Sequence, residues 1–203
     1  VRTRDFGARV VLEGESVSDG KPFADKIAAA EDLVFVHPYD APDIVSGQGT
    51  IGLEIFEDIP DLAAIVVPIG GGGVIAGIAM AAKELNPKIE IIGAEAQLYP
   101  SMYQAIHGLP PTSGSESIAE GIAVKAPGEI TKEIISRYVD DIILVDELSL
   151  ESAVQTMVET GKLVVEGAGA APLAAICQQQ NRFEGRRIGL IACGTNIDSR
   201  LLS

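Results

Sequence analysis

The sequence contains no tryptophan, and aromatic residues make up only 4% of its 203 positions. Hydrophobic residues nevertheless account for 47% of the chain, so its core must be built from aliphatic side chains. An aliphatic core is typical of central parallel strands that helices cover on both faces. The length suffices for one large domain, or for one domain together with part of another.

Basic residues are also scarce, since 15 Lys and Arg stand against 29 Asp and Glu and give a formal net charge of −14. Because nucleic-acid backbones require a basic surface, this balance argues against a nucleic-acid partner. Only two cysteines occur, Cys177 and Cys193. Their context is not that of a disulfide framework, so we expect a reducing, cytoplasmic setting.

Charge is absent altogether from residues 62–82, a stretch long enough to span a membrane. Pro68 and the glycines at its centre would leave backbone polar groups unpaired in lipid. A buried strand followed by a buried helix explains the stretch better, so we expect no membrane-spanning segment here.

Four consecutive glycines at residues 70–73 are the most informative motif in the chain. The β-branched run before them predicts a buried parallel strand, and the apolar run after them predicts a helix. Without Cβ atoms the loop can approach a ligand closely, and the helix directs its free N–H groups at that loop. We therefore predict a phosphate cradle. The alternative is a tight turn whose glycines serve packing only.

Strands and helices alternate along the remaining sequence. The patterns predict strands at residues 9–12, 33–36, 89–94, 142–145 and 187–192. They predict helices at residues 19–31, 50–57, 100–106 and 128–137, and a long helix from about residue 148 with Ser149 as its N-cap. This alternation predicts an α/β fold with a twisted parallel sheet and helices on both faces. Because ligands of such sheets bind at the carboxyl ends of strands, the tetraglycine loop, Glu95 and residues 193–196 should share one rim.

No Gly-Lys-Ser/Thr follows the four glycines, so the loop is not a nucleotide-triphosphate loop, and it suits one terminal phosphate group instead. Four segments carry a resemblance that narrows the ligand: Gly-Gln-Gly-Thr at 47–50, the glycine segment at 67–77, Ala-Glu-Gly-Ile-Ala at 119–123, and Cys-Gly-Thr-Asn-Ile-Asp at 193–198. In this order they resemble threonine dehydratases. The whole chain is similar to the branch of the tryptophan-synthase β-type pyridoxal-phosphate enzymes that also contains serine racemase.

The resemblance implies pyridoxal phosphate as the cofactor and gives a role to seven positions. Backbone N–H groups would hold its phosphate at Gly70, Gly71, Gly72, Gly73 and Val74. Gly121 would lie near the cofactor ring, and Cys193 stands where the family places a Ser or Cys that faces the pyridine nitrogen. A thiol donates a hydrogen bond to a neutral ring nitrogen, whereas a carboxylate would favour the protonated ring. Taken alone, Cys193 could equally be a buried small hydrophobe and Gly121 part of an ordinary turn.

Glu95 matches a family position that helps to bind a cation in serine racemases. A second acid assists six residues later in that family, but Ser101 occupies this position here. Surface solvation or a weaker monovalent site is therefore an alternative for Glu95. No His/Cys/Asp/Glu cluster has zinc-ligand spacing, so we assign no metal site and take His37 and His107 as structural loop residues.

Two motifs of the family do not occur in the sequence: the Ser-Phe-Lys type that contains the Schiff-base lysine, and the Ser-x-Gly-Asn-His loop that binds the substrate carboxylate. The resemblance therefore implies a C-terminal portion. Residues 1–40 would be a remnant of the small domain, and residues 41–203 would be the phosphate-binding large domain. That lysine normally also abstracts the α-proton, so the cofactor cannot be attached here in the family's covalent way, and we assign no catalytic residue.

The function implied by the resemblance is β-elimination of threonine or serine to a 2-oxo acid and ammonia. We expect the chain alone to be inactive. It is either one part of a split enzyme that needs a separate N-terminal fragment, or a non-catalytic cofactor-binding or assembly module. An unrelated sugar-phosphate binder is a third alternative. Missing strands would expose a sheet edge and apolar surface, which favours a homo-oligomer.

Overall fold

The structure is a computed structural model that describes residues 2–14 and 17–197. Its residues divide into two compact units, Val1–His37 and Pro38–Ser203. Asp198, the last residue of the Cys-Gly-Thr-Asn-Ile-Asp segment, lies outside the described residues.

The larger unit is built on a four-stranded sheet of order β3-β2-β1-β4 in which every pairing is parallel. The strands are β1 (Ala64–Ile69), β2 (Glu90–Ala96), β3 (Asp141–Val145) and β4 (Ile188–Leu190). Every residue of β1 is buried, as expected for a strand covered on both faces. Ala64 lies opposite Glu90 and Ile188, while Ile69 lies opposite Glu95 at the carboxyl end. The predicted parallel α/β sheet is confirmed.

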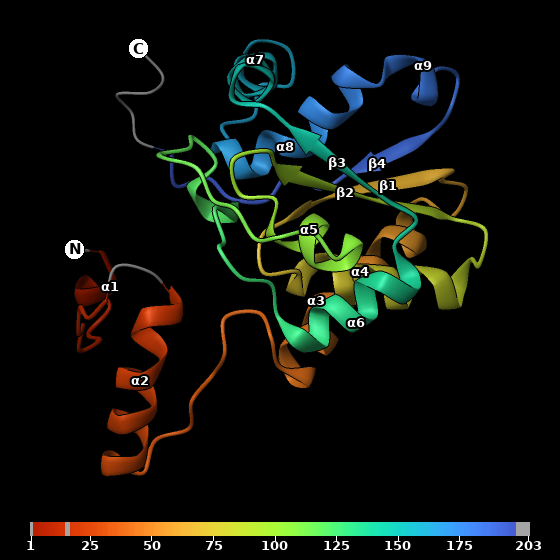
Figure 1. Ribbon diagram of the computed structural model, residues 1–203. Coiled ribbons are helices and arrows are strands. Elements are labelled where there is room, and N and C mark those ends of the chain that lie inside the picture. The colour runs from red at the N-terminus through yellow and green to blue at the C-terminus, as the bar shows by residue number, and fades with distance from the viewer. Residues whose placement is uncertain (1, 15–16, 198–203) are drawn as a thin grey trace. The chain divides into compact units, whose positions relative to one another are not determined.

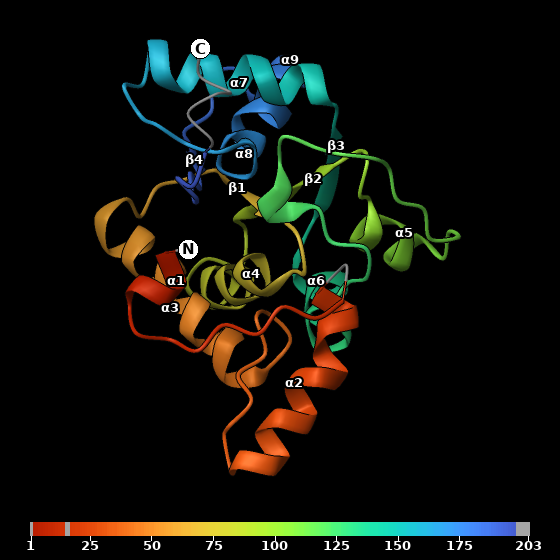
Figure 2. The ribbon, with the colours of Figure 1, turned by 90° about the vertical axis from the view of Figure 1, so that its left-hand side faces the viewer.

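Helices cover both faces of this sheet, as Figures 1 and 2 show. One face carries α3 (Pro42–Asp58), α4 (Gly73–Leu85) and α6 (Glu129–Tyr138), and the other carries α7 (Glu147–Glu159) and α8 (Gly167–Gln178). Three short helices complete the unit: α5 (Ser101–His107), the 3-10 turn η1 (Glu120–Ile122) and α9 (Gln180–Phe183). Alternation along β1 sends Ile65 and Val67 into the core under α4, and Ala64 and Val66 into the core under α8.

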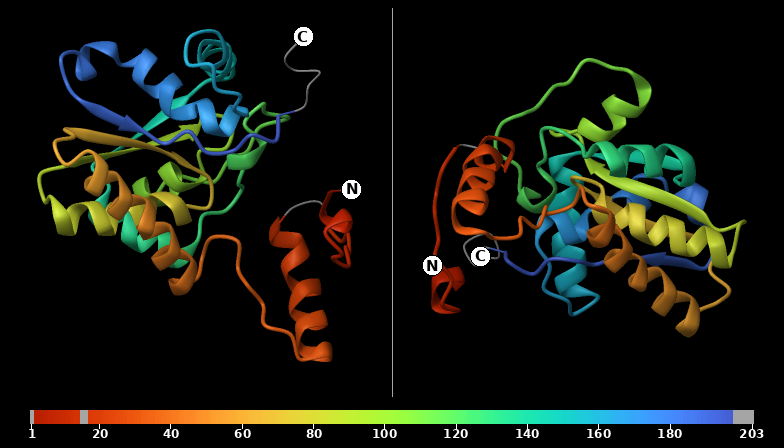
Figure 3. Two further views of the ribbon diagram at one scale, coloured as in Figure 1. Left: turned by 180° about the vertical axis from the view of Figure 1, so that it is seen from behind. Right: turned by 90° about the horizontal axis from the view of Figure 1, so that it is seen from below.

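Helix α3 begins at Pro42, so the helix predicted at residues 50–57 is present but starts earlier than the sequence pattern predicts. Proline suits the first turn because its missing N–H would have no helical acceptor there. Two glycines of this region, Gly49 and Gly52, serve packing, since α3 and α4 lie side by side (Figure 3). A Cβ added at Gly52 would lie 3.1 Å from the carbonyl oxygen of Ile78. Close helix packing therefore explains why glycine stands at this position.

Residues 62–82, the uncharged run, form the end of a loop, β1, the tetraglycine turn and most of α4. Among the described residues, no helix is both long and apolar enough to cross a membrane. At the start of α7, Asp146 is the N-cap, because its carboxylate accepts a 2.8 Å hydrogen bond from the N–H of Ser149. The prediction of Ser149 as N-cap is therefore wrong.

The smaller unit contains α1 (Arg2–Asp5) and α2 (Val17–Glu31). The strands predicted at residues 9–12 and 33–36 are not formed. A strand exists through pairing, and no backbone hydrogen bond joins these two segments within the described part of the unit. Their apolar side chains are largely exposed, with Leu12 82% and Val34 89% accessible to solvent.

Candidate functional site

The tetraglycine loop joins β1 to α4 at the carboxyl end of the sheet, where the sequence places it. Gly72 caps α4 with φ of 93°, a left-handed conformation that glycine adopts without strain. A Cβ added there would also lie 2.7 Å from Met102 Cε and 2.9 Å from Thr131 Oγ1. Two independent constraints, backbone conformation and space, therefore require glycine at this position.

Tyr39 covers one side of the loop. Its ring lies directly against Gly71, and its carbonyl oxygen would lie 3.0 Å from a Cβ added at Gly73. The Tyr39 hydroxyl donates a 3.3 Å hydrogen bond to the carbonyl of Ala126. Burial, and secondarily the nearby Asp40 carboxylate, raises the pKa of the Tyr39 phenol above its ordinary value. Packing thus accounts for part of the glycine run, as the alternative interpretation of the motif supposes.

Packing does not explain why the backbone N–H groups of the loop are left without hydrogen-bond acceptors. Among the described residues, neither the N–H of Gly71 nor that of Gly72 donates a hydrogen bond. Gly73 and Val74 open α4, where N–H groups have no acceptor within the helix. The first N–H to bond back is that of Ala76, at 3.0 Å from the carbonyl of Gly72. A row of free donors at a helix N-terminus is an arrangement that binds anions, and it fits a phosphate group.

The second glycine turn lies next to this loop. Gly121 is part of η1, and a Cβ added at Gly70 would lie 3.1 Å from Ile122 Cα and 3.4 Å from the carbonyl oxygen of Gly121. The fold therefore brings together two of the segments that the sequence analysis selected, although about 50 residues separate them.

Cys193 lies beyond the end of β4, and its carbonyl oxygen packs against Gly169 of α8. The next residue, Gly194, has φ of 91° and accepts a 3.1 Å hydrogen bond from the N–H of Glu166. Burial raises the pKa of the Cys193 thiol above its ordinary value, against a smaller lowering by a backbone hydrogen bond, and the negative charge of Glu166 adds a minor increase. The thiol is therefore favoured over the thiolate.

Glu166 is a residue that the sequence analysis missed. Its carboxylate lies between two of the selected segments, since a Cβ added at Gly121 would be 2.6 Å from its Oε1 and one at Gly194 would also clash with it. The pattern at residues 165–171 predicts only a turn of small residues leading into a helix. An acid placed directly before that helix, at the rim of the sheet, is the signal that could have indicated it.

Glu95 is completely buried at the carboxyl end of β2, so the alternative of surface solvation is wrong. Its carboxylate accepts hydrogen bonds from the N–H groups of Met102, at 2.7 Å, and Tyr103, at 2.9 Å. Burial raises the pKa of Glu95 to about 7, although these two hydrogen bonds oppose the shift. The Oγ of Ser101, at the position of the family's second acid, is buried without a hydrogen-bond partner.

A metal centre has no support in the part of the chain that the structure describes, where no three His, Cys, Asp or Glu residues are grouped to hold an ion. His107 is the last residue of α5 rather than a loop residue, and its Nδ1 lies 2.7 Å from the carbonyl oxygen of Tyr103.

Asp40 fixes α6 beside the tetraglycine loop. Its Oδ1 accepts hydrogen bonds from the N–H groups of Ile130, at 3.0 Å, and Thr131, at 3.1 Å, and its Oδ2 accepts one of 3.0 Å from Glu129. A carboxylate that accepts three N–H groups is a strong helix cap. The sequence pattern gives no sign of this cap, because the partners of Asp40 are about 90 positions away in the chain.

Comparison with known proteins agrees with this site. A family model described as pyridoxal-phosphate dependent enzyme matches residues 2–194. The L-threonine ammonia-lyase of Thermotoga maritima is 39% identical over 203 residues, which cover 99% of this chain and 50% of that protein. An L-threonine dehydratase of Staphylococcus aureus is 40% identical over 201 residues, covering 97% of this chain and 58% of that protein. The chain thus spans about half the length of the curated relatives that it matches.

Solved structures give the same result. A threonine deaminase from T.th. superposes with a TM-score of 0.89 at 30% identity, covering 96% of this chain and 65% of that one. Maize serine racemase superposes with a TM-score of 0.88 at 32% identity, covering 98% of this chain and 64% of that one. With the family model matched along nearly the whole length, the chain belongs to the family of pyridoxal-phosphate dependent enzymes.

Proposed function

We propose that this chain is the phosphate-binding part of a dehydratase that converts threonine or serine to a 2-oxo acid and ammonia. The observation that carries the proposal is the row of free N–H donors at residues 71–74, at the N-terminus of α4. Relatives named L-threonine ammonia-lyase and L-threonine dehydratase supply the reaction class.

Different residues of the site would bind different parts of the cofactor. The phosphate would lie against the N–H groups of Gly70, Gly71, Gly72, Gly73 and Val74. Gly121 would lie beside the ring, and the thiol of Cys193 would donate a hydrogen bond to the ring nitrogen. When bound, pyridoxal phosphate supplies an electron sink that permits loss of a β-hydroxyl group. A neutral donor at the ring nitrogen suits that elimination, because the departing hydroxyl relieves the negative charge.

Three lysines of the larger unit have partners other than the tetraglycine loop. Lys83 donates to the carbonyl of Ile89, at the amino end of β2, and pairs with Asp140 at 2.8 Å. Lys132 pairs with Glu129, and Lys162 donates to the carbonyl of Glu159. We therefore propose that these 203 residues alone have little or no dehydratase turnover, and that the lysine is supplied by the half of the relatives' length that they do not span, here called the companion half.

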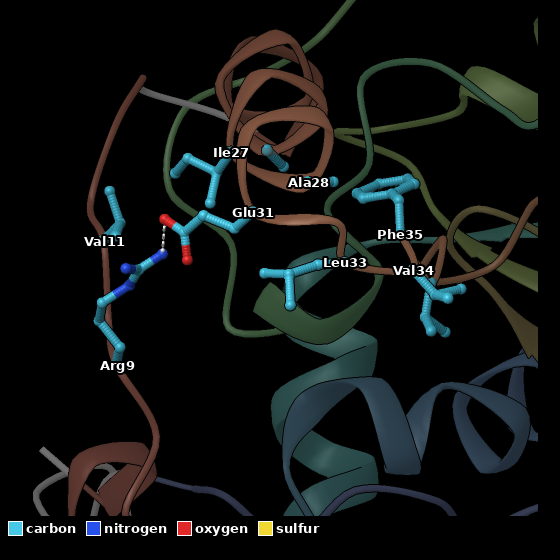
Figure 4. A pocket seen from close by; sticks show the side chains of 10 residues that line it. Arg9, Val11, Ile27, Ala28, Glu31, Leu33, Val34 and Phe35 are labelled. Carbon is cyan, nitrogen blue, oxygen red and sulfur yellow. Dashed lines mark hydrogen bonds and ion pairs between the residues drawn. The ribbon is translucent and has the colours of Figure 1, made fainter.

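The smaller unit offers a place for that companion. Helix α2 and the irregular segments on either side of it enclose a groove of about 610 Å³ (Figure 4). Its lining residues are Arg9, Val11, Ala24, Ile27, Ala28, Glu31, Leu33, Val34, Phe35 and Val36. The Arg9–Glu31 ion pair of 2.7 Å joins the first segment to the helix.

The chemistry of the groove fits a β-strand. Two segments that carry strand-like apolar sequences flank it without pairing to each other, and Val34 and Val36 are 89% and 66% exposed. A strand laid between them would satisfy their backbone groups and bury their side chains. We propose that the half of the relatives' length that this chain does not span provides this strand. Homo-oligomers would be an alternative way to cover the same apolar surface.

The test is reconstitution. The chain is mixed with pyridoxal phosphate and threonine, with and without the half of the Thermotoga maritima relative that it does not match, and 2-oxo acid is measured. We expect turnover only with the companion half. Oxo-acid release at ordinary enzyme rates from the chain alone would contradict the proposed inactivity. Tight association without turnover would favour the non-catalytic assembly module instead.

Two variants locate the docking surface. Val34→Lys places a charge in the groove and should abolish association with the companion half. Leu148→Lys is the matched control, because Leu148 is a 75% exposed residue on α7 of the other unit. Equal association of both variants with the companion half would contradict the groove as its binding surface. Self-association of the wild type that Val34→Lys removes would instead identify a second copy as the occupant.

A further inference from the structure

The aromatic ring of Tyr39 lies where a side chain at Gly71 would begin. A Cβ added at Gly71 would fall onto three ring carbons of Tyr39. A Cβ added at Gly73 would lie 3.0 Å from the carbonyl oxygen of Tyr39 and 3.1 Å from its Cβ. One half-buried residue therefore packs against two of the four glycines of the loop.

The carbonyl group of Gly71 is held by α6 at the same time. Its oxygen accepts a 2.7 Å hydrogen bond from Thr131 Oγ1 and a longer one, of 3.4 Å, from the N–H of Gly128. Asp40, the residue after Tyr39, accepts the N–H of Thr131 at 3.1 Å and so ties α6 to the segment that carries the ring. Residues 39 and 40 thus act on Gly71 twice, directly through the ring and indirectly through the helix.

A run of four glycines needs such support from outside itself. Glycine has more backbone conformations available than any other residue, so an unsupported run would direct its N–H groups many ways. An anion would have to order these peptides on binding, and its affinity would be lower. Gly71 does not have a left-handed φ, so the space taken by the Tyr39 ring, and not the backbone conformation, requires glycine at this position.

We propose that Tyr39 is a positioning residue of the phosphate site, whose ring holds the Gly71 peptide so that the N–H groups of the loop are arranged before the anion binds. The inference deepens the proposed function and rests on it. The ring has this role and the hydroxyl does not, because the bond from the hydroxyl to the carbonyl of Ala126 is 3.3 Å, long for an O–H donor.

The first test measures the coupling between the ring and Gly71 and needs no cofactor. Gly71→Ala adds a methyl group where the ring lies, and it should lower the melting temperature of the otherwise wild-type chain by several degrees. In a Tyr39→Ala background the space is vacant, and Gly71→Ala should lower the melting temperature much less. An equal decrease in both backgrounds would overturn the inference. Tyr39→Leu, whose flexible side chain can yield to the methyl group, replaces Tyr39→Ala if that variant does not fold by circular dichroism, with the same expectation.

The second test compares the affinities of the chain for pyridoxal phosphate and for pyridoxal, since their ratio reports the phosphate contacts alone. Tyr39→Ala should reduce this ratio at least about threefold through weaker binding of pyridoxal phosphate. Tyr39→Phe keeps the ring and should retain the wild-type ratio. Tyr138→Ala is the matched control, because Tyr138 is also half-buried and is the last residue of α6. It should lower the melting temperature and leave the ratio unchanged.

An unchanged ratio in Tyr39→Ala would overturn the role of Tyr39, as would an equal fall in Tyr39→Phe or Tyr138→Ala. Failure of the proposed function gives a different result: the wild-type chain would bind both compounds equally, or neither. In that case the melting temperatures of Gly71→Ala in the two backgrounds still decide whether Tyr39 holds the loop.

Discussion

Thr131 Oγ1 donates a 2.7 Å hydrogen bond to the carbonyl oxygen of Gly71, and both residues are buried. This bond ties the tetraglycine loop to α6, whose own N-terminus is capped by Asp40. The orientation of the Gly71 peptide fixes the direction of the neighbouring N–H groups. The loop is thus held from outside itself, by a helix about 60 residues later in the chain.

Removing this hydrogen bond should loosen the loop. Thr131→Val keeps the shape of the side chain but leaves the Gly71 carbonyl with only the longer, 3.4 Å bond from the N–H of Gly128. We expect a loss of about 1–2 kcal/mol in unfolding free energy and weaker binding of pyridoxal phosphate, measured by urea denaturation and by titration. Thr131→Ser keeps the hydroxyl and should behave like the wild type in binding; weakened binding in both variants would show that the hydroxyl is not responsible.

The cap at Asp40 makes a second prediction. Asp40→Ala deprives three N–H groups of α6 of their acceptor, and we expect a loss of about 1–2 kcal/mol in unfolding free energy. Glu133→Ala, at an exposed position of the same helix, should change stability by less than about 0.5 kcal/mol. Similar losses in the two variants would contradict a specific capping role.

Glu95 should make stability depend on pH. Its pKa is raised from an ordinary 4.5 to about 7 in the folded protein, so the folded state holds the proton more tightly than the unfolded chain. The resulting stabilisation is fully present below the ordinary value and is lost as the pH rises towards about 7. The unfolding free energy of the wild type should therefore fall between pH 4.5 and 7, by at most about 3 kcal/mol from this group.

Glu95→Gln removes that titration while keeping an acceptor for one of the two N–H groups. The difference in unfolding free energy between wild type and variant should change over this pH interval and stay constant above it. A difference that is flat across the whole range would show that Glu95 does not titrate there.

The contact between α3 and α4 gives a matched pair of glycine variants. A Cβ at Gly77 would clash with the carbonyl oxygen of Val45, so Gly77→Ala should cost about 2 kcal/mol or more. Gly47 in α3 has open space around it, and Gly47→Ala should instead stabilise the helix by about 0.5–1 kcal/mol. Thermal denaturation of the two variants should move the melting temperature in opposite directions; shifts of the same sign would contradict the packing described for α3 and α4.

Sequence patterns predict local features of this protein well and non-local ones poorly. The strand before the glycines, the helix after them and the parallel sheet follow from apolar periodicity and are present in the structure. The prediction of a strand at residues 33–36 is wrong because a strand needs a pairing partner. The apolar pattern does not indicate whether such a partner is present.

The same limit applies to the site. The position of Gly121 beside Gly70 follows from the rule that parallel sheets gather ligand-binding loops at one edge. The burial of Glu95, the cap provided by Asp40 and the carboxylate of Glu166 above Gly194 depend on contacts between residues that are distant in the chain. These side chains are polar residues at element ends, and only the folded arrangement distinguishes them from solvated surface acids.

The proposed function depends most on the tetraglycine loop as a phosphate site. Its most direct test is calorimetric titration of the chain with pyridoxal phosphate and, in parallel, with pyridoxal, which has the same ring and no phosphate. We predict saturable binding of pyridoxal phosphate, at least about tenfold weaker binding of pyridoxal, and competition by inorganic phosphate. Equal affinity for the two compounds, or binding of neither, would contradict the phosphate site.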